Sequence, residues 1–181
     1  ELRNFLWKES DCFGLWKQTL TAKNLGQLLM PLADESFKTG LASIAHEIEN
    51  SLNSADDLHV ILCSLNEGQC KQFLAAVQGK LTDIIKDGEQ LGRALRYLNE
   101  TQCGVLLAAV QGKLSDIIKD SEQLGRALRY LNETQRGVLL DAVQGKLTDI
   151  IKDGRQLGDV LMCLNETQCG VLLAAVQGKL S

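Results

Sequence analysis

The sequence predicts an all-α fold in which 33-residue helical repeats stack as a short solenoid. Two motifs recur at this step: Leu-Asn-Glu at 65–67, 98–100, 131–133 and 164–166, and Gln-Gly-Lys-Leu at 78–81, 111–114, 144–147 and 177–180. Between the motifs, apolar residues follow one another at three- and four-residue spacing, as in amphipathic helices. Hydrophobic residues make up 45% of the chain but aromatic residues only 4%, with one proline, which favours helix over strand.

The copies are close to identical in sequence. Segments 65–97 and 98–130 match at 27 of 33 positions, and residues 164–181 repeat residues 98–115 without a change. A degenerate copy over 32–64 aligns without a gap. We therefore expect a repeat array over 32–181, with units 32–64, 65–97, 98–130 and 131–163 and a partial unit 164–181. Residues 1–31 are expected to form an N-terminal capping segment, held by bulky aromatic residues at Phe5, Trp7, Phe13 and Trp16.

Each unit reads as two helices with a short turn between them, and 98–130 serves as the example. Asn99 followed by Gln102 is a capping-box pattern, so a helix of about 14 residues should start at Glu100. Its apolar stripe comprises Cys103, Leu106, Leu107, Val110 and Leu114. Ser115 is expected to cap a short helical turn. Asp120 then starts a second helix of about 10 residues with a stripe of Leu124, Ala127, Leu128 and Leu131.

Composition and charge exclude several function classes. The net charge of −4 and the pI near 5.2 give no reason to expect nucleic acid or an anionic membrane as a partner. No apolar run approaches the roughly 18 residues of a membrane span. The six cysteines form no Cys-x-x-Cys pair, so we expect a reduced, intracellular protein. Because the chain begins at Glu1, we expect it to be part of a larger protein.

Two familiar repeats have this period or one close to it, about 33 residues for ankyrin and about 34 for the tetratricopeptide, but their residue patterns fit poorly. Ala108-Ala109-Val110-Gln111-Gly112 resembles the ankyrin Ala-Ala-x-x-Gly run, but Cys103-Gly104-Val105-Leu106 stands where ankyrin has Thr-Pro-Leu-His. Ankyrin remains an alternative. The tetratricopeptide pattern, which requires Trp, Tyr and Pro at set positions, is not found here.

The unit 131–163 resembles helical repeats found in effector proteins of intracellular bacterial pathogens. The residues that carry the resemblance are Leu131, Gln135, Leu139, Lys146-Leu147, Asp149-Ile150-Ile151-Lys152, Leu157-Gly158, Leu161 and Leu164. The resemblance covers 32–181. It implies secretion into the cytosol of a host cell and binding to a host protein, and it brings no catalytic residues.

No catalytic, cofactor or metal site is expected. His46 and His59 have no companion motif, so we expect solvated histidines on helix surfaces. Cys70, Cys103 and Cys169 share one repeat position that Arg136 also occupies, which argues against a fixed thiol site. The recurring aspartates at 83, 116 and 149 are expected to pair with lysines three residues later. These regular patterns indicate that the chain is not an enzyme.

The most informative surface feature is an arginine–tyrosine stripe, which comprises Arg93, Arg96, Tyr97, Arg126, Arg129 and Tyr130. The stripe ends in the next unit, where Asp159 and Met162 replace the arginines. Because Arg and Tyr are favoured binding anchors, the stripe is the expected contact with an acidic protein partner. The alternative is that these arginines pair with nearby Asp and Glu on a solvated face.

The sequence therefore predicts a protein–protein interaction scaffold. The alternative is a structural spacer or self-association module beside a catalytic domain outside this chain. Leu172, Leu173 and Val176 of the partial unit are expected to lack a covering neighbour, so a homo-oligomer could form there.

Overall fold

The computed structural model describes residues 21–177, and throughout that range the chain is helical with no strand. The all-α prediction is confirmed for these residues. Most of the expected capping segment, residues 1–20, lies outside the described range. In chain order the helices are α3 (Ala22–Leu29), α4 (Asp34–Ser43), α5 (Ala45–Ser51), α6 (Ala55–Cys63), α7 (Glu67–Ala76), α8 (Gln78–Ile84), α9 (Gly88–Leu95), α10 (Glu100–Val110), η1 (Gln111–Lys113), α11 (Leu114–Ile117), α12 (Ser121–Arg129), α13 (Glu133–Val143), η2 (Gln144–Lys146), α14 (Leu147–Ile150), α15 (Gly154–Leu161) and α16 (Glu166–Val176), where η marks a 3-10 helix.

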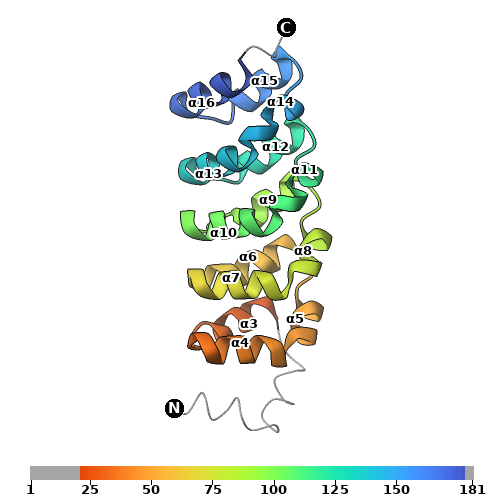
Figure 1. Cartoon of the computed structure of the whole chain (residues 1–181), viewed down its shortest axis with the longest axis vertical. Helices are drawn as coiled ribbons and strands as arrows, with labels where there is room; N and C mark the ends of the chain where they lie inside the picture. Colours follow the sequence, from red (N-terminus) through yellow and green to blue (C-terminus); the bar gives the residue numbers. More distant parts are fainter. Residues whose placement is uncertain (1–20, 178–181) are drawn as a thin grey trace.

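The helices lie in layers along one axis (Figure 1). In one column α3, α6, α9, α12 and α15 follow one another, and each contacts the next. In a second column α4, α7, α10 and α13 do the same. The short helices α5, α8, α11 and α14 lie along one edge of the layers. Helices that correspond in sequence are therefore neighbours in space.

Local capping sets where the helices begin. The Asn99 side chain accepts a hydrogen bond from the Gln102 backbone, and the Gln102 side chain accepts one from the Asn99 backbone, which completes the predicted capping box of α10. The same box opens α7, α13 and α16. Asp120 caps α12, so this helix starts at Ser121 as predicted. The prediction for Ser115 is wrong: α11 begins at Leu114 and has no side-chain cap.

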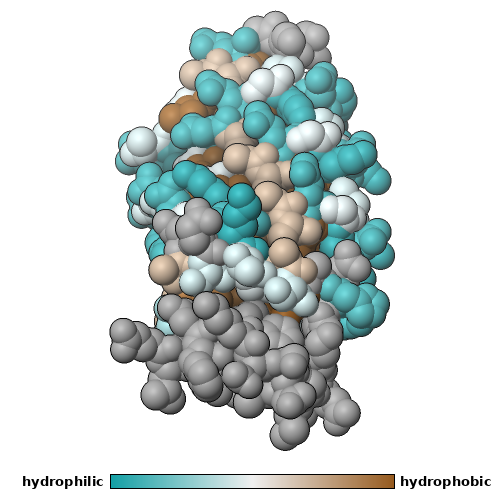
Figure 2. All heavy atoms as spheres, turned by 60° about the horizontal axis from the view of Figure 1, so that its bottom comes forward, coloured by the Kyte–Doolittle hydropathy of each residue, from teal (hydrophilic) through white to brown (hydrophobic). Residues whose placement is uncertain are grey.

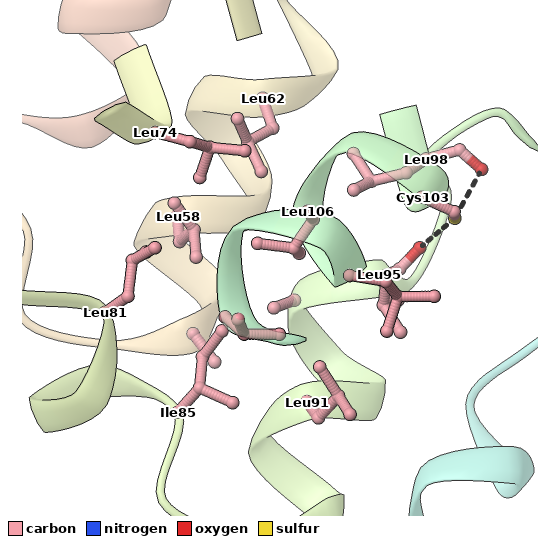
Figure 3. Packing of buried hydrophobic residues seen from close by; sticks show 14 of the residues in the cluster. Leu58, Leu62, Leu74, Leu81, Ile85, Leu91, Leu95, Leu98, Cys103 and Leu106 are labelled. Carbon is pink, nitrogen blue, oxygen red and sulfur yellow. Dashed lines mark hydrogen bonds between the residues drawn. The ribbon is translucent and has the colours of Figure 1, made fainter. Parts of the chain in front are cut away.

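Apolar side chains from all layers form one continuous core. Both stripes predicted for the unit 98–130 are buried. Figure 3 shows Leu58 and Leu62 of α6, Leu91 and Leu95 of α9 and Leu106 of α10 meeting between two layers. Full burial of one leucine side chain is worth about 2 kcal/mol, so the leucines that meet between layers stabilise the packing of one layer on the next.

In the four units from residue 65 onward, one glutamine joins neighbouring layers: Gln69, Gln102, Gln135 and Gln168. The Gln102 side chain is buried, and its Nε2 donates to the carbonyl oxygens of Leu62 at 3.0 Å and Leu65 at 2.8 Å. Gln135 does the same to Leu95 at 3.1 Å and Leu98 at 2.6 Å. These carbonyls lie at and after the end of a second helix, where backbone acceptors need partners. The glutamine thus caps its own helix and the end of a helix in the preceding layer.

Two glycines, Gly88 and Gly92, allow α9 and α12 to approach closely. A Cβ atom at Gly88 would stand 1.8 Å from the Gln123 carbonyl oxygen, and one at Gly92 would stand 2.7 Å from that of Ala127. By contrast, a Cβ at the recurring motif glycine Gly112 would meet open space. That glycine marks the end of the first helix rather than a close contact.

Two further expectations are wrong. Leu172 and Val176 are buried, because α16 packs against α14, although Leu173 remains 45% exposed. The helical spacing of Asp116 and Lys119 is broken because α11 ends at Ile117. The described residues contain no ion pair between any of the three recurring aspartates and its lysine.

Candidate binding site

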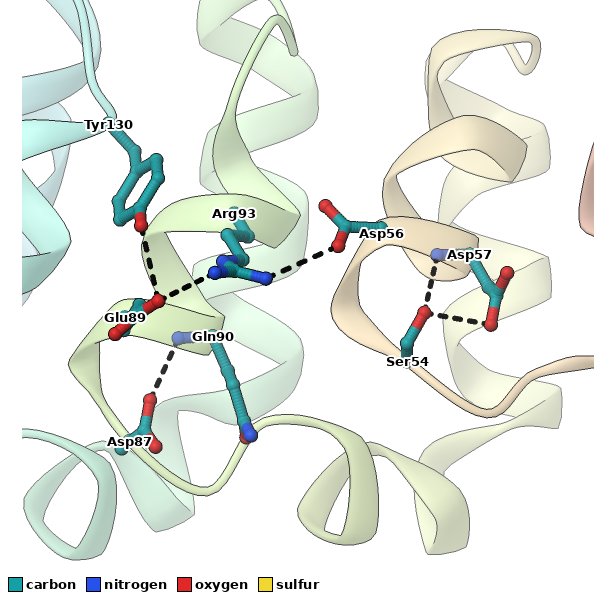
Figure 4. A network of polar contacts seen from close by, with 8 residues as sticks. All are labelled: Ser54, Asp56, Asp57, Asp87, Glu89, Gln90, Arg93 and Tyr130. Atoms are coloured by element: carbon teal, nitrogen blue, oxygen red, sulfur yellow. Dashed lines mark hydrogen bonds and ion pairs between the residues drawn. The ribbon is translucent and has the colours of Figure 1, made fainter.

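The stripe lies on α9 and α12 and the turns that follow them. Arg93 lies within α9 and Arg96 caps its end, while Arg126 and Arg129 lie in the last turn of α12. Because α9 and α12 pack side by side, residues from the two units meet. Figure 4 shows Tyr130 reaching across to Glu89 and Arg93 of α9.

Two of the four arginines are already paired. Arg93 Nη2 lies 2.7 Å from Glu89 Oε1, and Arg93 Nη1 lies 3.6 Å from Asp56 Oδ2. Arg126 Nη2 lies 2.6 Å from Glu122 Oε1. Hydrogen bonding with Tyr130 and Glu89 raises the pKa of Arg93, so this guanidinium stays charged. The alternative of a solvated, internally paired face describes these two arginines correctly.

The other two arginines have no carboxylate partner in the described part of the chain. The Arg96 guanidinium stacks over the Tyr97 ring, 4.6 Å from its centroid. Arg129 makes no ion pair with any described residue. Two of the four stripe arginines thus carry positive charge that no described carboxylate neutralises.

An open pocket of about 340 Å³ lies between α9 and α12. Its lining comprises Glu89, Arg126, Arg129 and Tyr130. Glu89 is occupied by Arg93 and by the Tyr130 hydroxyl, which donates to it at 3.2 Å. Arg129 is the lining cation that remains free to bind an incoming carboxylate.

The two tyrosines of the stripe lie in different environments. Tyr130 is half-buried, with the Arg93 guanidinium 5.9 Å from its ring centroid. Tyr97 is 67% exposed, and its φ of 65° places it in the left-handed region, alone among the described residues other than glycine. Side chains other than glycine rarely adopt that conformation, and such outliers cluster at functional sites.

His59 on α6 lies beneath Tyr97. The two ring centroids are 5.6 Å apart, and His59 Nδ1 lies 3.5 Å from the Cys63 sulfur. Burial lowers the pKa of His59 and raises the pKa of Cys63, so the pair is neutral and the thiol is not an activated nucleophile. His46 is exposed as predicted, whereas His59 is half-buried. No group of three or more His, Cys, Asp or Glu within the described range could hold a metal ion.

The shared cysteine position binds backbone rather than carrying chemistry. Cys103 Sγ lies 3.8 Å from the carbonyl oxygens of Leu95 and Leu98, which it faces in Figure 3. Burial raises the pKa of Cys103 to about 11, so the thiol is protonated near neutral pH. At the same position Arg136 donates from Nε to the carbonyl oxygen of Leu128 at 3.1 Å. Thiol and guanidinium thus both act at this position as hydrogen-bond donors to the end of the preceding helix.

The face of the molecule that Figure 2 draws is mostly hydrophilic where its residues are described. Figure 2 shows one narrow band of weakly apolar side chains along the stack, between hydrophilic flanks. None of the described helices has the length and hydrophobicity to cross a bilayer. In comparisons with known proteins, no family model, curated protein or solved structure matches the chain.

Two features of the site were not predicted from the sequence. The first is the role of His59, which lies one layer below the stripe and carries no motif. The second is the difference between the paired arginines, Arg93 and Arg126, and the free ones. Spacing does hint at the second feature, because Glu89 and Glu122 each stand four residues before the arginine that they pair with.

Proposed function

We propose that this chain is a short solenoid of 33-residue helical repeats that acts as a protein-binding scaffold. The packing of each helix against its counterpart one unit away supports the solenoid. So does the glutamine that joins neighbouring layers. A stack of this kind offers a long, rigid surface on which binding residues recur at a fixed spacing.

The partner-binding surface is the arginine–tyrosine stripe, and the partner presents acidic residues. The observation that carries this proposal is the pair of unneutralised guanidinium groups, Arg96 and Arg129, beside the exposed Tyr97. Arginine and tyrosine lose little conformational entropy for the contact area they supply, which makes them frequent hot spots. An acidic segment would neutralise the free guanidinium groups.

The cellular setting follows from the resemblance to repeats of bacterial effector proteins. On that basis the chain belongs to a virulence protein that a bacterium secretes into the host cytosol, and its partner is a host protein. A reducing cytosol fits the free cysteines at 63, 70, 103, 163 and 169.

Affinity purification from a host-type lysate tests this function. The variant reverses the charge of all four stripe arginines to Glu. The matched control reverses four basic residues outside the stripe, Lys86, Lys119, Lys152 and Arg155, so both proteins carry the same net charge. We expect the stripe variant to lose partners that the wild type and the control retain. Equal recovery by both variants would exclude the stripe as the binding surface.

Exposed apolar side chains favour a second candidate, a structural spacer or self-association module. Met162 is 80% exposed, Leu173 45% and Val171 43%, all on α16 or the turn before it. Such side chains can bury one another between two copies of the chain. Sedimentation of the wild type and of a Leu173→Glu variant distinguishes the candidates, because a scaffold that does not self-associate stays monomeric in both forms.

A further inference from the structure

Two identical stretches of this chain adopt different conformations. Residues 89–102 and 122–135 share the same 14-residue sequence, Glu-Gln-Leu-Gly-Arg-Ala-Leu-Arg-Tyr-Leu-Asn-Glu-Thr-Gln. In the second stretch Tyr130 continues the right-handed backbone, with φ −86° and ψ −11°. In the first stretch α9 ends earlier, Arg96 has ψ 131°, and Tyr97 has φ 65°. The cause must lie outside the stretch.

The layer below supplies that cause. Tyr130 packs over Gly92, and its Cδ2 would stand 2.9 Å from a Cβ at that position. The residue one repeat earlier, which underlies Tyr97, is His59. The ring centroids of His59 and Tyr97 are 5.6 Å apart. The His59 imidazole thus fills the space below Tyr97 that corresponds to the space left open by Gly92 below Tyr130. Tyr97 therefore cannot fold inward as Tyr130 does.

The interactions that hold Tyr130 inward are also missing below Tyr97. The Tyr130 hydroxyl binds Glu89, and the Arg93 guanidinium lies over its ring. One repeat earlier these positions are Asp56, which has a shorter side chain and pairs with Arg93, and Val60, which has no charge. The outward position of Tyr97 follows from both differences.

The outward turn presents a cation stacked on an aromatic ring. Arg96 lies 4.6 Å from the Tyr97 centroid and pairs with no carboxylate among the described residues. The stacking fixes the guanidinium before a partner arrives, which reduces the entropy lost on binding. Arg129, which makes no ion pair with a described residue, holds the corresponding repeat position one layer along the stack. Stacked helices lie roughly 8–10 Å apart, the span of two to three residues in an extended peptide.

We propose that Arg96 and Tyr97, held outward by His59, form the anchor site of this scaffold, and that the anchor site takes a carboxylate side chain of an extended acidic peptide. Tyr130, its twin in sequence, is an internal packing residue instead. A second carboxylate two to three residues along the peptide reaches Arg129. This assignment rests on the proposed function and narrows it to one of the two identical turns.

Binding of a fluorescently labelled hexaglutamate peptide tests the anchor site, with a hexaglutamine peptide as the neutral probe. The double variant Arg96→Gln/Tyr97→Ala should weaken hexaglutamate binding about tenfold or more. The double variant Arg126→Gln/Tyr130→Ala changes the same residue types in the twin stretch, and it should weaken hexaglutamate binding less than the anchor variant does, because Arg126 is already paired with Glu122.

Three outcomes are informative. Loss in the first variant alone supports the anchor site. Binding that both variants retain, or that only the twin variant loses, overturns the anchor site and leaves the scaffold function standing. A wild-type chain that binds hexaglutamate no better than hexaglutamine overturns both proposals.

The role of His59 has its own readout, because the chain contains two tyrosines, Tyr97 and Tyr130. Nitration followed by mass spectrometry should modify Tyr97 faster than Tyr130 in the wild type. In His59→Gly, Tyr97 should fold inward, so that its nitration slows and hexaglutamate binding weakens. His59→Phe keeps the bulk without the polar ring and should retain both properties. Unchanged nitration of Tyr97 in a folded His59→Gly variant would show that His59 does not hold the ring outward.

Discussion

Arg136 Nε donates to the carbonyl oxygen of Leu128, the acceptor that corresponds to Leu95 one unit earlier. The Leu95 carbonyl oxygen accepts from two side chains, the Cys103 thiol and the Gln135 amide. With Arg136 on Leu128, Gln168 binds the Glu133 carbonyl oxygen instead, at 2.7 Å. A longer side chain thus shifts the link between the last two layers.

Replacing Arg136 with Cys should restore the regular link. We expect Gln168 to bind the carbonyl oxygens of Leu128 and Leu131, and the free energy of unfolding to rise by about 1 kcal/mol, the net value of one added buried hydrogen bond. Urea unfolding measures the change. The mirror variant Cys103→Arg should destabilise the fold, because it introduces the same shift into the middle of the stack. A stabilising Cys103→Arg variant would contradict this account.

The glutamine links should contribute much more than a surface cap. Gln102→Ala removes two inter-layer hydrogen bonds and one bond to the Asn99 backbone, and it leaves the Leu62 oxygen with only a weak thiol donor. At about 1 kcal/mol per bond, we expect a loss of about 2–4 kcal/mol in unfolding free energy. Gln90→Ala is the control, because Gln90 Oε1 accepts only from the exposed Lys86 backbone, and it should cost under about 1 kcal/mol.

Alanine substitutions at Gly88 and Gly104 should change the stability of the fold in opposite directions, because Gly88 lies against a neighbouring helix and Gly104 faces open space. Gly88→Ala places a methyl group 1.8 Å from the Gln123 carbonyl oxygen, so α9 and α12 must move apart. Overpacking of this kind costs about 1–3 kcal/mol. Gly104→Ala, within α10 and facing open space, should instead stabilise the chain by up to about 1 kcal/mol through helix propensity. Thermal unfolding of the two variants tests the contrast.

Thiol burial predicts how stability depends on pH. An ordinary thiol has a pKa of 9.0, whereas burial raises the pKa of Cys70 and Cys103 to about 11. Between these values the unfolded chain releases protons that the folded chain keeps, so the unfolding free energy should fall as pH rises from 9 towards 11. A Cys70→Ala/Cys103→Ala variant should show a flatter pH profile. Equal slopes in the two proteins would contradict the assignment.

Local signals made most of the fold predictable. Asn99 and Gln102 lie three residues apart, so their capping box is visible in the sequence and places the start of α10 correctly. The link from Gln102 to Leu62 and Leu65 spans 40 and 37 residues, and no local pattern contains it. The prediction for Ser115 was wrong for a different, local reason: the chain enters α11 directly from a 3-10 turn, which leaves no capping position there.

The candidate site was predictable in composition but not in conformation. Repetition pointed to Arg96, Tyr97, Arg129 and Tyr130 as a set, and it gave no reason to separate the two tyrosines. Their surroundings differ at the residue one repeat upstream, His59 in one case and Gly92 in the other. Only the packing of α6 beneath α9 shows that this upstream position decides the conformation.

The twin tyrosines provide the last prediction, on stability. Tyr97 has φ 65°, which costs an L-residue roughly 1–2 kcal/mol but costs glycine little. Its ring is largely exposed, so Tyr97→Gly loses little packing and should raise the unfolding free energy by about 1 kcal/mol. Tyr130 has a right-handed backbone conformation and a half-buried ring, so Tyr130→Gly should lower the unfolding free energy by about 2 kcal/mol. Because the flanking sequence is identical, opposite signs in urea unfolding would reflect the different conformations and surroundings of the two tyrosines. Equal destabilisation by both variants would mean that Tyr97 folds inward as Tyr130 does.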